Sequence, residues 1–503
     1  MSRKPKTSTS GQSSLLEPGR NCWRIERAER AALVVDAADY FRLARDAMLN
    51  AKSQILLIGW DLDTRIKMIG EKQDESGEAD VPVHLGPFLA WLAKRRPELR
   101  IYILAWNGEL LSLLGRGTTL ARMAVWRMLN KTISFRLDHT PPLAASHHHK
   151  ILVIDDALAF CGGIDMTGSR WDTRNHKDDE PGRQRPTTHR PYGPWHDATM
   201  AVDGAVARAL GDLGRQRWKE ACNQVVKAPS VKSDPWPDDL APDFHEVEIS
   251  ISRTRGDANG AEIREIEALF VDLINSAERF LYVEQQYFAS RIIAEAMAKR
   301  LSEADPPEVL IVNPCNADGW LEEEMMGAAR AELVEILRKA DHKDRFRIYY
   351  PVTTQGENIY VHAKIMIVDD VVLKVGSANM NNRSLGLDSE CDVTIDARRP
   401  ANEGCRKKIE ALRFDLMAEH LGVAPAKVAR AFNETNSLIA TVDRLRGDRR
   451  SLRLYQPPEF SAPSKALAKA EVADPESAAE PFEPFARRRL VRGFLQRLRG
   501  RRG

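Results

Sequence analysis

The hydrophobic pattern of this chain runs through the same series of elements twice. Residues 38–63 and residues 264–288 each combine apolar positions at helical spacing with a following apolar run, which predicts an amphipathic helix leading into a strand. The later apolar runs pair in the same order: 99–107 with 307–315, and 133–138 with 346–351. This alternation indicates an α/β fold, with helices packed on a mostly parallel or mixed sheet.

Two copies of one series indicate a duplicated domain. A solenoid needs three or more units, so we expect two pseudo-twofold-related halves, each a mixed sheet flanked by helices. The length of 503 residues allows two such halves with tails, and a Pro-rich stretch separates them. The expected order is a disordered tail (1–20), the first half (21–225), a linker (226–243), the second half (244–445) and a low-order tail (446–503).

Each half contains the pattern His-x-Lys-x4-Asp. It reads HHKILVID at 148–155 and HAKIMIVD at 362–369, and a small residue follows each Asp at the same distance, Gly163 in the first copy and Ser377 in the second. Apolar runs on both sides of the Asp predict a tight β-hairpin. Side chains alternate along a strand, so each copy places its histidine and its lysine on one face.

Paired histidines and lysines suit the cleavage of a phosphodiester by double displacement. A neutral imidazole attacks phosphorus while a protonated one supplies the proton for the leaving oxygen, and the ordinary imidazole pKa of about 6.5 allows both states near neutral pH. Ammonium groups stabilise the phosphoryl oxygens. The candidate residues are His148, Lys150, His362 and Lys364, with Asn379 as a nearby amide donor. This chemistry requires no metal or other cofactor, and no metal-ligand cluster stands out, since His147 and His149 are expected to point to the opposite face.

These motifs give the chain a family resemblance. It resembles the phospholipase D superfamily, which is defined by two such motifs, and it resembles the true phospholipase D enzymes more closely than the superfamily at large. The likeness extends over roughly 35–420 and rests on the stretches FCGGIDMTGSRWDT (160–173), PWHDATMAVDG (194–204), RQRW (215–218), LYVEQQYF (281–288), IYVHAKIMIVDD (359–370) and GSANMNNRSL (376–385).

The resemblance implies an active site between the two halves. Either His148 or His362 would attack phosphorus and the other would protonate the leaving alcohol. The first-motif histidine is usually the nucleophile in related enzymes, which favours His148. The phosphate would be held by Lys150, Lys364 and Asn379.

Superposing the two halves aligns Asp197 with Glu390. We expect each carboxylate to orient a histidine through its Nδ1 atom. The longer spacing in the first half is absorbed by the polar stretch 174–193, which is expected to form a surface loop. Ser377 belongs to the same phosphate-binding or orienting group. The first half has Asp165 where the second has Asn379, so the phosphate site is not expected to be symmetric.

The acidic residues that complete the motifs, Asp155 and Asp369, count among the candidate catalytic residues. Their place at a strand end before a turn nevertheless favours a structural role. Three tryptophans near the motifs are expected in the core or in the wall of a pocket: Trp60, Trp171 and Trp195.

The composition is that of an ordinary globular protein, with 43% hydrophobic and 29% charged residues. The six cysteines are scattered, which disfavours a disulfide framework and favours a reducing compartment. No apolar stretch approaches the ~18 residues needed to cross a bilayer, and no signal-peptide core is visible, so we expect a cytoplasmic location. The formal net charge of +2 decides nothing about partners.

A phospholipid such as phosphatidylcholine is the expected substrate, cleaved to phosphatidic acid or transferred to an alcohol. The alternatives are a phosphatidyltransferase like cardiolipin synthase, whose relatives usually carry N-terminal membrane helices, and a nuclease of the same superfamily. Single-motif nucleases dimerise to build one site, whereas this chain contains both halves, so nucleic acid is disfavoured. A module that only binds would not need both His-x-Lys pairs. No obligate protein partner is implied.

The last residues, 485–503, combine apolar positions at i, i+3, i+4 and i+7 with many arginines. Such a basic amphipathic segment can lie in a membrane interface and attract anionic headgroups. Peripheral membrane association is therefore one expectation. A solvated tail or a non-specific contact with nucleic acid is the other.

Overall fold

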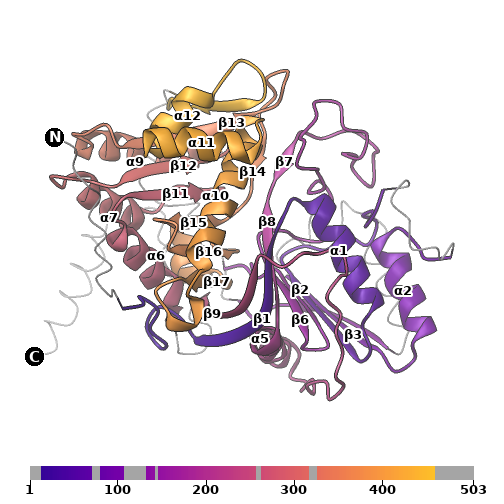
Figure 1. Cartoon of the computed structure of the whole chain (residues 1–503). Helices are drawn as coiled ribbons and strands as arrows, with labels where there is room; N and C mark the ends of the chain where they lie inside the picture. Colours follow the sequence, from indigo (N-terminus) through magenta and orange to yellow (C-terminus); the bar gives the residue numbers. More distant parts are fainter. Residues whose placement is uncertain are drawn as a thin grey trace, which may run out of the picture.

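The computed structural model describes residues 13–70, 80–106, 132–141, 145–256, 262–316 and 326–458. Within these residues, the long strands of both halves belong to a single mixed sheet of 16 strands. The expectation of one sheet per half is therefore wrong in this respect. Figure 1 shows the later, orange elements on one side and the earlier, purple elements on the other, with β1 and β9 running between them.

The elements keep the predicted helix and strand alternation. The strands are β1 (Arg24–Val35), β2 (Gln54–Gly59), β3 (Arg100–Trp106), β4 (Ile133–Asp138), β5 (Ile151–Ile154), β6 (Leu158–Gly162), β7 (Trp195–His196), β8 (Ala198–Asp203), β9 (Phe244–Arg255), β10 (Ile263–Arg264), β11 (Phe280–Glu284), β12 (Glu308–Val312), β13 (Phe346–Val352), β14 (Tyr360–Val361), β15 (Ile365–Val368), β16 (Val372–Gly376), β17 (Glu390–Asp396) and β18 (Ser451–Leu454). The α-helices are α1 (Ala37–Leu49), α2 (Leu85–Arg95), α5 (Gly204–Cys222), α6 (Glu265–Ser276), α7 (Arg291–Leu301), α9 (Ala328–Ala340), α10 (Cys405–Leu421), α11 (Pro425–Thr435) and α12 (Leu438–Leu445).

The order of the strands mirrors itself about the centre of the sheet. It runs β18-β13-β12-β11-β15-β16-β17-β9-β1-β8-β6-β5-β2-β3-β4. Outward from the β9–β1 pair, β17 corresponds to β8, the β16–β15 hairpin to the β6–β5 hairpin, and β11, β12 and β13 to β2, β3 and β4. Both predicted hairpins are present as antiparallel pairs. The alternation of helices and strands also predicts a helix between the runs 99–107 and 133–138, and residues 107–131 lie outside the described residues.

The central pair joins the halves because both strands are long and share one apolar face. They run antiparallel, with Ala28 opposite Val247 and Glu26 opposite Ile249. Ala28, Val247 and Ile249 are fully buried in a core that also receives side chains from α5 and α10. On the opposite face, one core lies under α1 and α2 and another under α6, α7 and α9. Helices therefore cover both faces of the sheet, as α/β folds require.

Both tails contain more structure than expected. Ser451–Leu454, placed in the low-order tail, forms β18 and pairs antiparallel with β13. Near the other end, Leu16 is buried and the Ser14 hydroxyl donates to Asp396. The basic segment 485–503 lies outside the described residues. No helix among the described residues is long and apolar enough to cross a membrane.

Candidate active site

The two motif histidines lie at the junction of the halves, each just before its hairpin. The backbone N–H of His148 donates to the carbonyl oxygen of Ser389 at 3.0 Å. The N–H of His362 donates to the carbonyl oxygen of His196 at 2.7 Å. Each histidine is therefore held by backbone from the opposite half.

The carboxylates that orient the histidines are also exchanged between the halves. His148 Nδ1 lies 3.0 Å from both carboxylate oxygens of Glu390. His362 Nδ1 lies 2.6 Å from Asp197 Oδ2. Each carboxylate thus meets an Nδ1 atom, and in both pairs the histidine belongs to the other half. With Nδ1 occupied, Nε2 is the atom left for chemistry on each ring.

Each carboxylate is fixed by its own neighbours. Glu390 accepts hydrogen bonds from the hydroxyls of Ser377 at 2.5 Å and Ser384 at 2.7 Å. Asp197 accepts from the backbone N–H of Ala198 at 2.8 Å. A Cβ atom at Gly163, the counterpart of Ser377, would lie 2.1 Å from Asp197 Oδ1. The glycine leaves room for the shorter acid, whereas Ser377 donates a hydrogen bond to the longer one.

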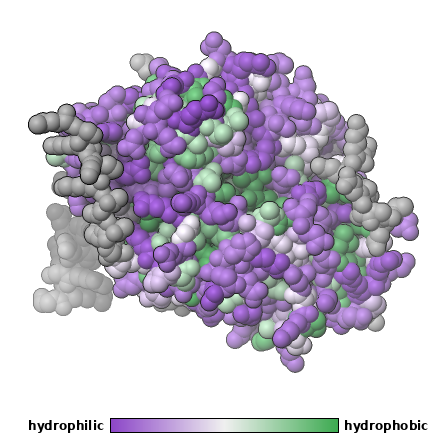
Figure 2. All heavy atoms as spheres, in the orientation of Figure 1, coloured by the Kyte–Doolittle hydropathy of each residue, from purple (hydrophilic) through white to green (hydrophobic). Residues whose placement is uncertain are grey.

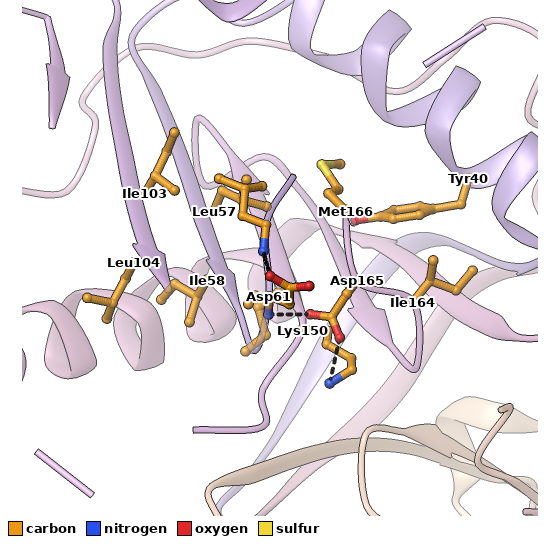
Figure 3. A pocket seen from close by; sticks show the side chains of 13 residues that line it. Tyr40, Leu57, Ile58, Asp61, Ile103, Leu104, Lys150, Ile164, Asp165 and Met166 are labelled. Atoms are coloured by element: carbon orange, nitrogen blue, oxygen red, sulfur yellow. Dashed lines mark hydrogen bonds and ion pairs between the residues drawn. The ribbon is translucent and has the colours of Figure 1, made fainter. Parts of the chain in front are cut away.

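The two lysines have different partners, as the Asp165 and Asn379 positions predicted. Lys150 Nζ lies 3.0 Å from Asp165 Oδ2, and Figure 3 shows Asp165 between this ammonium and the backbone of Asp61. Lys364 Nζ instead donates to Gln286 Oε1 at 2.9 Å. The Asn379 amide donates to the same oxygen at 3.4 Å. Each lysine also donates to the carbonyl oxygen of its own motif histidine.

Burial shifts the pKa of nearly every group in this site. It lowers the pKa of both His148 and His362 well below the ordinary value, and the nearby lysines lower it further. Burial also lowers the pKa of Lys364 to about 7 and raises that of Asp197 to about 6 and that of Glu390 to about 7. Before a ligand binds, the direction of these shifts favours the neutral form of both imidazoles. A bound phosphate anion would offset the lysines and favour protonation of one ring.

Aromatic side chains flank both histidines. The Trp60 ring meets His148 edge-on at 6.2 Å, and the Trp195 ring lies 5.2 Å from His362. Tyr360 stacks on Trp195 at 4.5 Å, and the Arg170 guanidinium lies 4.3 Å from the Trp195 ring. Trp60 and Trp195 therefore form part of the wall of the site, in agreement with the sequence analysis.

The acidic residues of the motifs do not reach the site. Asp155 accepts hydrogen bonds from the backbone N–H groups of Lys52, Ser53 and Gln54, at 2.7 to 2.8 Å. Asp369 accepts from Glu278, Arg279 and Phe280 in the same way. Both carboxylates tie the hairpin to the start of a neighbouring strand. Asp155 and Asp369 therefore have a structural role, and their inclusion among the catalytic candidates is wrong.

The other two histidines of the HHH run lie away from the site. His147 Nε2 is 2.9 Å from His149 Nδ1, and both side chains are buried. At one end of the pair, His147 Nδ1 lies 3.0 Å from a carboxylate oxygen of Asp138. At the other end, His149 Nε2 lies 3.0 Å from the carbonyl oxygen of Glu390. This buried chain supports the backbone of Glu390.

Three features of the site escaped the sequence analysis. Gln286 and Ser384 contact the predicted residues, and only the run EQQY and the sequence NNRS near the second motif could have drawn attention to them. The third is a cluster of potential metal ligands behind Asp197: Asp36, His176, His196 and Glu419. The spacing of these four residues along the sequence gave no sign of this group.

Comparisons with known proteins agree with this architecture. A family model described as PLDc: Phospholipase D matches residues 291–448. Phospholipase D A of Dictyostelium discoideum is 26% identical over 471 residues, which cover 78% of this chain and 36% of that protein. Phospholipase D alpha 4 of Arabidopsis thaliana is 22% identical, with 75% of this chain and 62% of that protein covered. This chain thus spans less than two thirds of the length of either relative.

A solved structure shows the same fold. The crystal structure of phosphatidylserine synthase from Haemophilus influenzae matches with a TM-score of 0.52 and 14% sequence identity. The match covers 88% of this chain and 93% of that one, so it includes both halves.

Proposed function

Since the chain belongs to the phospholipase D superfamily, we propose that it is a phosphodiesterase that cleaves phospholipids of the phosphatidylcholine type through a phosphohistidine. The observation that carries this proposal is the exchanged pairing of two histidines with two carboxylates, His148 with Glu390 and His362 with Asp197. An imidazole held at Nδ1 by a buried carboxylate is a good nucleophile at Nε2 and a good carrier of a proton. Two such units from opposite halves suit in-line displacement at one phosphorus.

In the first displacement, His148 Nε2 forms a bond to phosphorus as the bond from phosphorus to the headgroup oxygen breaks. His362 gives its proton to that oxygen, and the headgroup leaves as an alcohol. In the second displacement, water gives a proton to His362 and attacks phosphorus, which releases His148 and phosphatidic acid. An alcohol in place of water gives a transferred phosphatidyl group. The ammonium groups of Lys150 and Lys364 stabilise the phosphoryl oxygens in both steps.

Several features support a lipid over a nucleic acid. The relatives with matching sequence are named phospholipase D, and the structural neighbour is a phosphatidylserine synthase. Aromatic side chains, including Trp60 and Trp195, flank the histidines. Figure 2 shows small hydrophobic groups scattered over a largely hydrophilic face, some of them toward the middle of the view. A phosphodiester with acyl chains needs such apolar contacts beside the phosphate site.

The test offers the full chain three substrates: phosphatidylcholine in mixed micelles, phosphatidylglycerol vesicles, and single- and double-stranded DNA. We expect release of choline and phosphatidic acid, and formation of phosphatidylbutanol when 1-butanol is added. Transfer between two phosphatidylglycerol molecules, without hydrolysis, would favour the cardiolipin synthase-like alternative. Cleavage of DNA alone would contradict the lipid proposal. A His148→Asn variant in parallel controls for contaminating enzymes.

We also propose that the basic segment 485–503 draws the enzyme to anionic membranes. Its arginines and its apolar positions at helical spacing support this role. Deleting 485–503 should weaken sedimentation with phosphatidylglycerol vesicles while leaving cleavage of a short-chain soluble lipid intact. Equal vesicle binding with and without the segment would exclude a membrane role for it.

A further inference from the structure

A second group of titratable side chains lies buried directly behind Asp197. Asp36 donates its backbone N–H to the carbonyl oxygen of Asp197 at 2.8 Å and accepts the Asp197 N–H at its Oδ1 at 3.1 Å. Around Asp36 lie His176, His196 and Glu419, all with side chains almost without solvent exposure. Asp36 precedes α1, His176 lies in the 174–193 loop, His196 ends β7 and Glu419 lies in α10. The proposed cleavage chemistry uses none of these four side chains.

Donor atoms from all four residues of this group face one another at short range. Glu419 Oε1 lies 2.9 Å from His196 Nδ1 and 3.1 Å from His176 Nε2. Asp36 Oδ1 lies 3.3 Å from His196 Nδ1, and Asp36 Oδ2 lies 3.5 Å from His176 Nε2. Zinc bonds of about 2.0–2.1 Å in a tetrahedron put neighbouring ligand atoms about 3.3 Å apart. The four measured separations bracket that value.

Three of the four residues are also held from behind, which leaves one donor atom of each directed inward. His176 Nδ1 lies 2.9 Å from a carboxylate oxygen of Asp172. His196 Nε2 lies 2.8 Å from a carboxylate oxygen of Glu284. The second oxygen of Glu419 accepts from Arg174. Carboxylates behind metal-bound histidines fix their tautomer and increase their basicity, and they are typical of zinc sites in proteins.

One atom in the group points independently to a ligand. Asp36 is 1% exposed, and its Oδ2, 3.5 Å from His176 Nε2, accepts no hydrogen bond from the residues that the structure describes. A buried carboxylate oxygen without a donor is costly, and a cation would satisfy it.

We propose that Asp36, His176, His196 and Glu419 bind a zinc ion that fastens the two halves together behind Asp197. Two imidazoles and two carboxylates are a donor set that zinc accepts in tetrahedral geometry. Three ligands come from the first half and Glu419 comes from the second. The ion fixes Asp36 and thereby the Asp197 backbone, and it takes no part in the chemistry at phosphorus.

Two other arrangements compete with this one. Without an ion, two protons on His176 and His196 would carry the same charge as one zinc ion, and the four residues would form imidazolium–carboxylate pairs. Alternatively, an ion could sit on the far side of His196, between its Nε2 atom, Glu284 and His420. That group offers only three ligands, and Tyr282 already donates to Glu284 at 2.6 Å. The four-ligand group is therefore favoured.

The experiment measures zinc in the full chain after loading with zinc chloride and gel filtration. We expect about one ion per wild-type chain, and at least about a hundredfold weaker binding in His176→Asn and in Glu419→Gln. His420→Asn is the matched control, since it removes a buried histidine from the competing group, and it should keep its zinc. Cobalt(II) in place of zinc should give the visible absorption of a tetrahedral site in the wild type and in the control.

Thermal unfolding supplies a second readout that is independent of activity. Zinc removal should lower the Tm of the wild type by at least about 5 °C and leave the Tm of His176→Asn unchanged. Wild-type protein that retains no zinc and whose Tm ignores added zinc would overturn the proposal in favour of the protonated network. Loss of zinc from His420→Asn but not from His176→Asn would move the site to the competing group. The wild-type measurements stand even where a variant fails to fold.

Discussion

The two halves of the site hold their motif lysines, Lys150 and Lys364, differently. In the first half Lys150 faces a carboxylate, Asp165, at 3.0 Å. In the second half Lys364 faces neutral amides, with Gln286 at 2.9 Å and Asn379 next to it. Burial lowers the Lys364 pKa to about 7, although the nearby Asp197 carboxylate acts to raise it. The difference teaches that two copies of one motif can hold their lysines in different ways. A carboxylate of the protein accompanies the Lys150 ammonium, whereas we expect the charge of Lys364 to depend more on a bound substrate anion.

The histidines give the largest expected effect, because both halves must act on one phosphorus. His148→Ala and His362→Ala should each lower kcat by about 10⁴-fold or more, and the double variant should be little worse than either one. Residues that act as a unit show this non-additivity. Steady-state choline release with phosphatidylcholine micelles measures it. Turnover near the wild-type level in either variant would contradict the two-histidine mechanism.

The orienting carboxylates come next. Asp197→Asn and Glu390→Gln keep the size of the side chain but remove its charge, so each should lower kcat by about 10²- to 10⁴-fold with KM little changed. Because the pairs are exchanged, Glu390→Gln should act through His148, and a burst of phosphohistidine in single-turnover experiments should slow in this variant. A fast burst followed by slow release in Glu390→Gln would instead assign the nucleophile to His362.

Exchanging Asp165 and Asn379 between the halves tests directly whether the two lysines differ because of their neighbours. Asn379→Asp gives Lys364 a carboxylate like the one beside Lys150, and the added negative charge should raise KM by about 10- to 100-fold through repulsion of the phosphate. Asp165→Asn makes the reverse change at Lys150 and should alter KM by less than about tenfold. Equal effects of the two substitutions would show that the halves hold the phosphate alike.

The same asymmetry predicts a pH dependence. Lys364 loses its proton as the pH rises through about 7, so kcat/KM should fall on the alkaline side. Glu390, with a pKa raised to about 7, gains its proton as the pH drops, so activity should also fall on the acidic side. Asn379→Asp stabilises the Lys364 ammonium, so the alkaline fall in kcat/KM should move to higher pH. If the alkaline fall in kcat/KM stays at the same pH in this variant, it is caused by the titration of another group.

The smallest effect on catalysis is expected where the halves are most alike. Asp155→Ala and Asp369→Ala each remove a carboxylate that accepts three backbone hydrogen bonds. Each change should lower the free energy of unfolding by about 2–4 kcal/mol while kcat changes less than about twofold. Urea unfolding and initial rates measure the two quantities. A large loss of kcat in a folded variant would show that Asp155 or Asp369 takes part in catalysis.

The sequence predicted the hairpins and the helix–strand units because their apolar spacing is local. It did not reveal β1 as a central strand, since the charges of the segment RIERAERAALVV interrupt the alternation along its first half. Strand β9 alternates more regularly, but nothing local shows that it pairs with β1. Long-range pairing depends on which faces meet after folding, which a single strand does not encode.

The same limit applies to the site. Aligning the repeats identified Asp197 and Glu390, but it could not show that each would serve the histidine of the other half. The proposed zinc ligands were hidden for a related reason. Glu419 lies more than two hundred residues beyond His176 and His196, so no motif spacing connects them. Only the packing of α10 against the first half brings them together.

The pairing of β1 with β9 also determines when the site can form during synthesis. Strand β1 is made early, yet its partner β9 lies more than two hundred residues further along the chain. Until β9 emerges, β1 presents an unpaired sheet edge that can recruit other chains. Such distant pairing forms slowly and leaves a partly made chain prone to aggregation. Expression of the first half alone should therefore favour edge-to-edge association, and chaperone demand should peak before Phe244 leaves the ribosome.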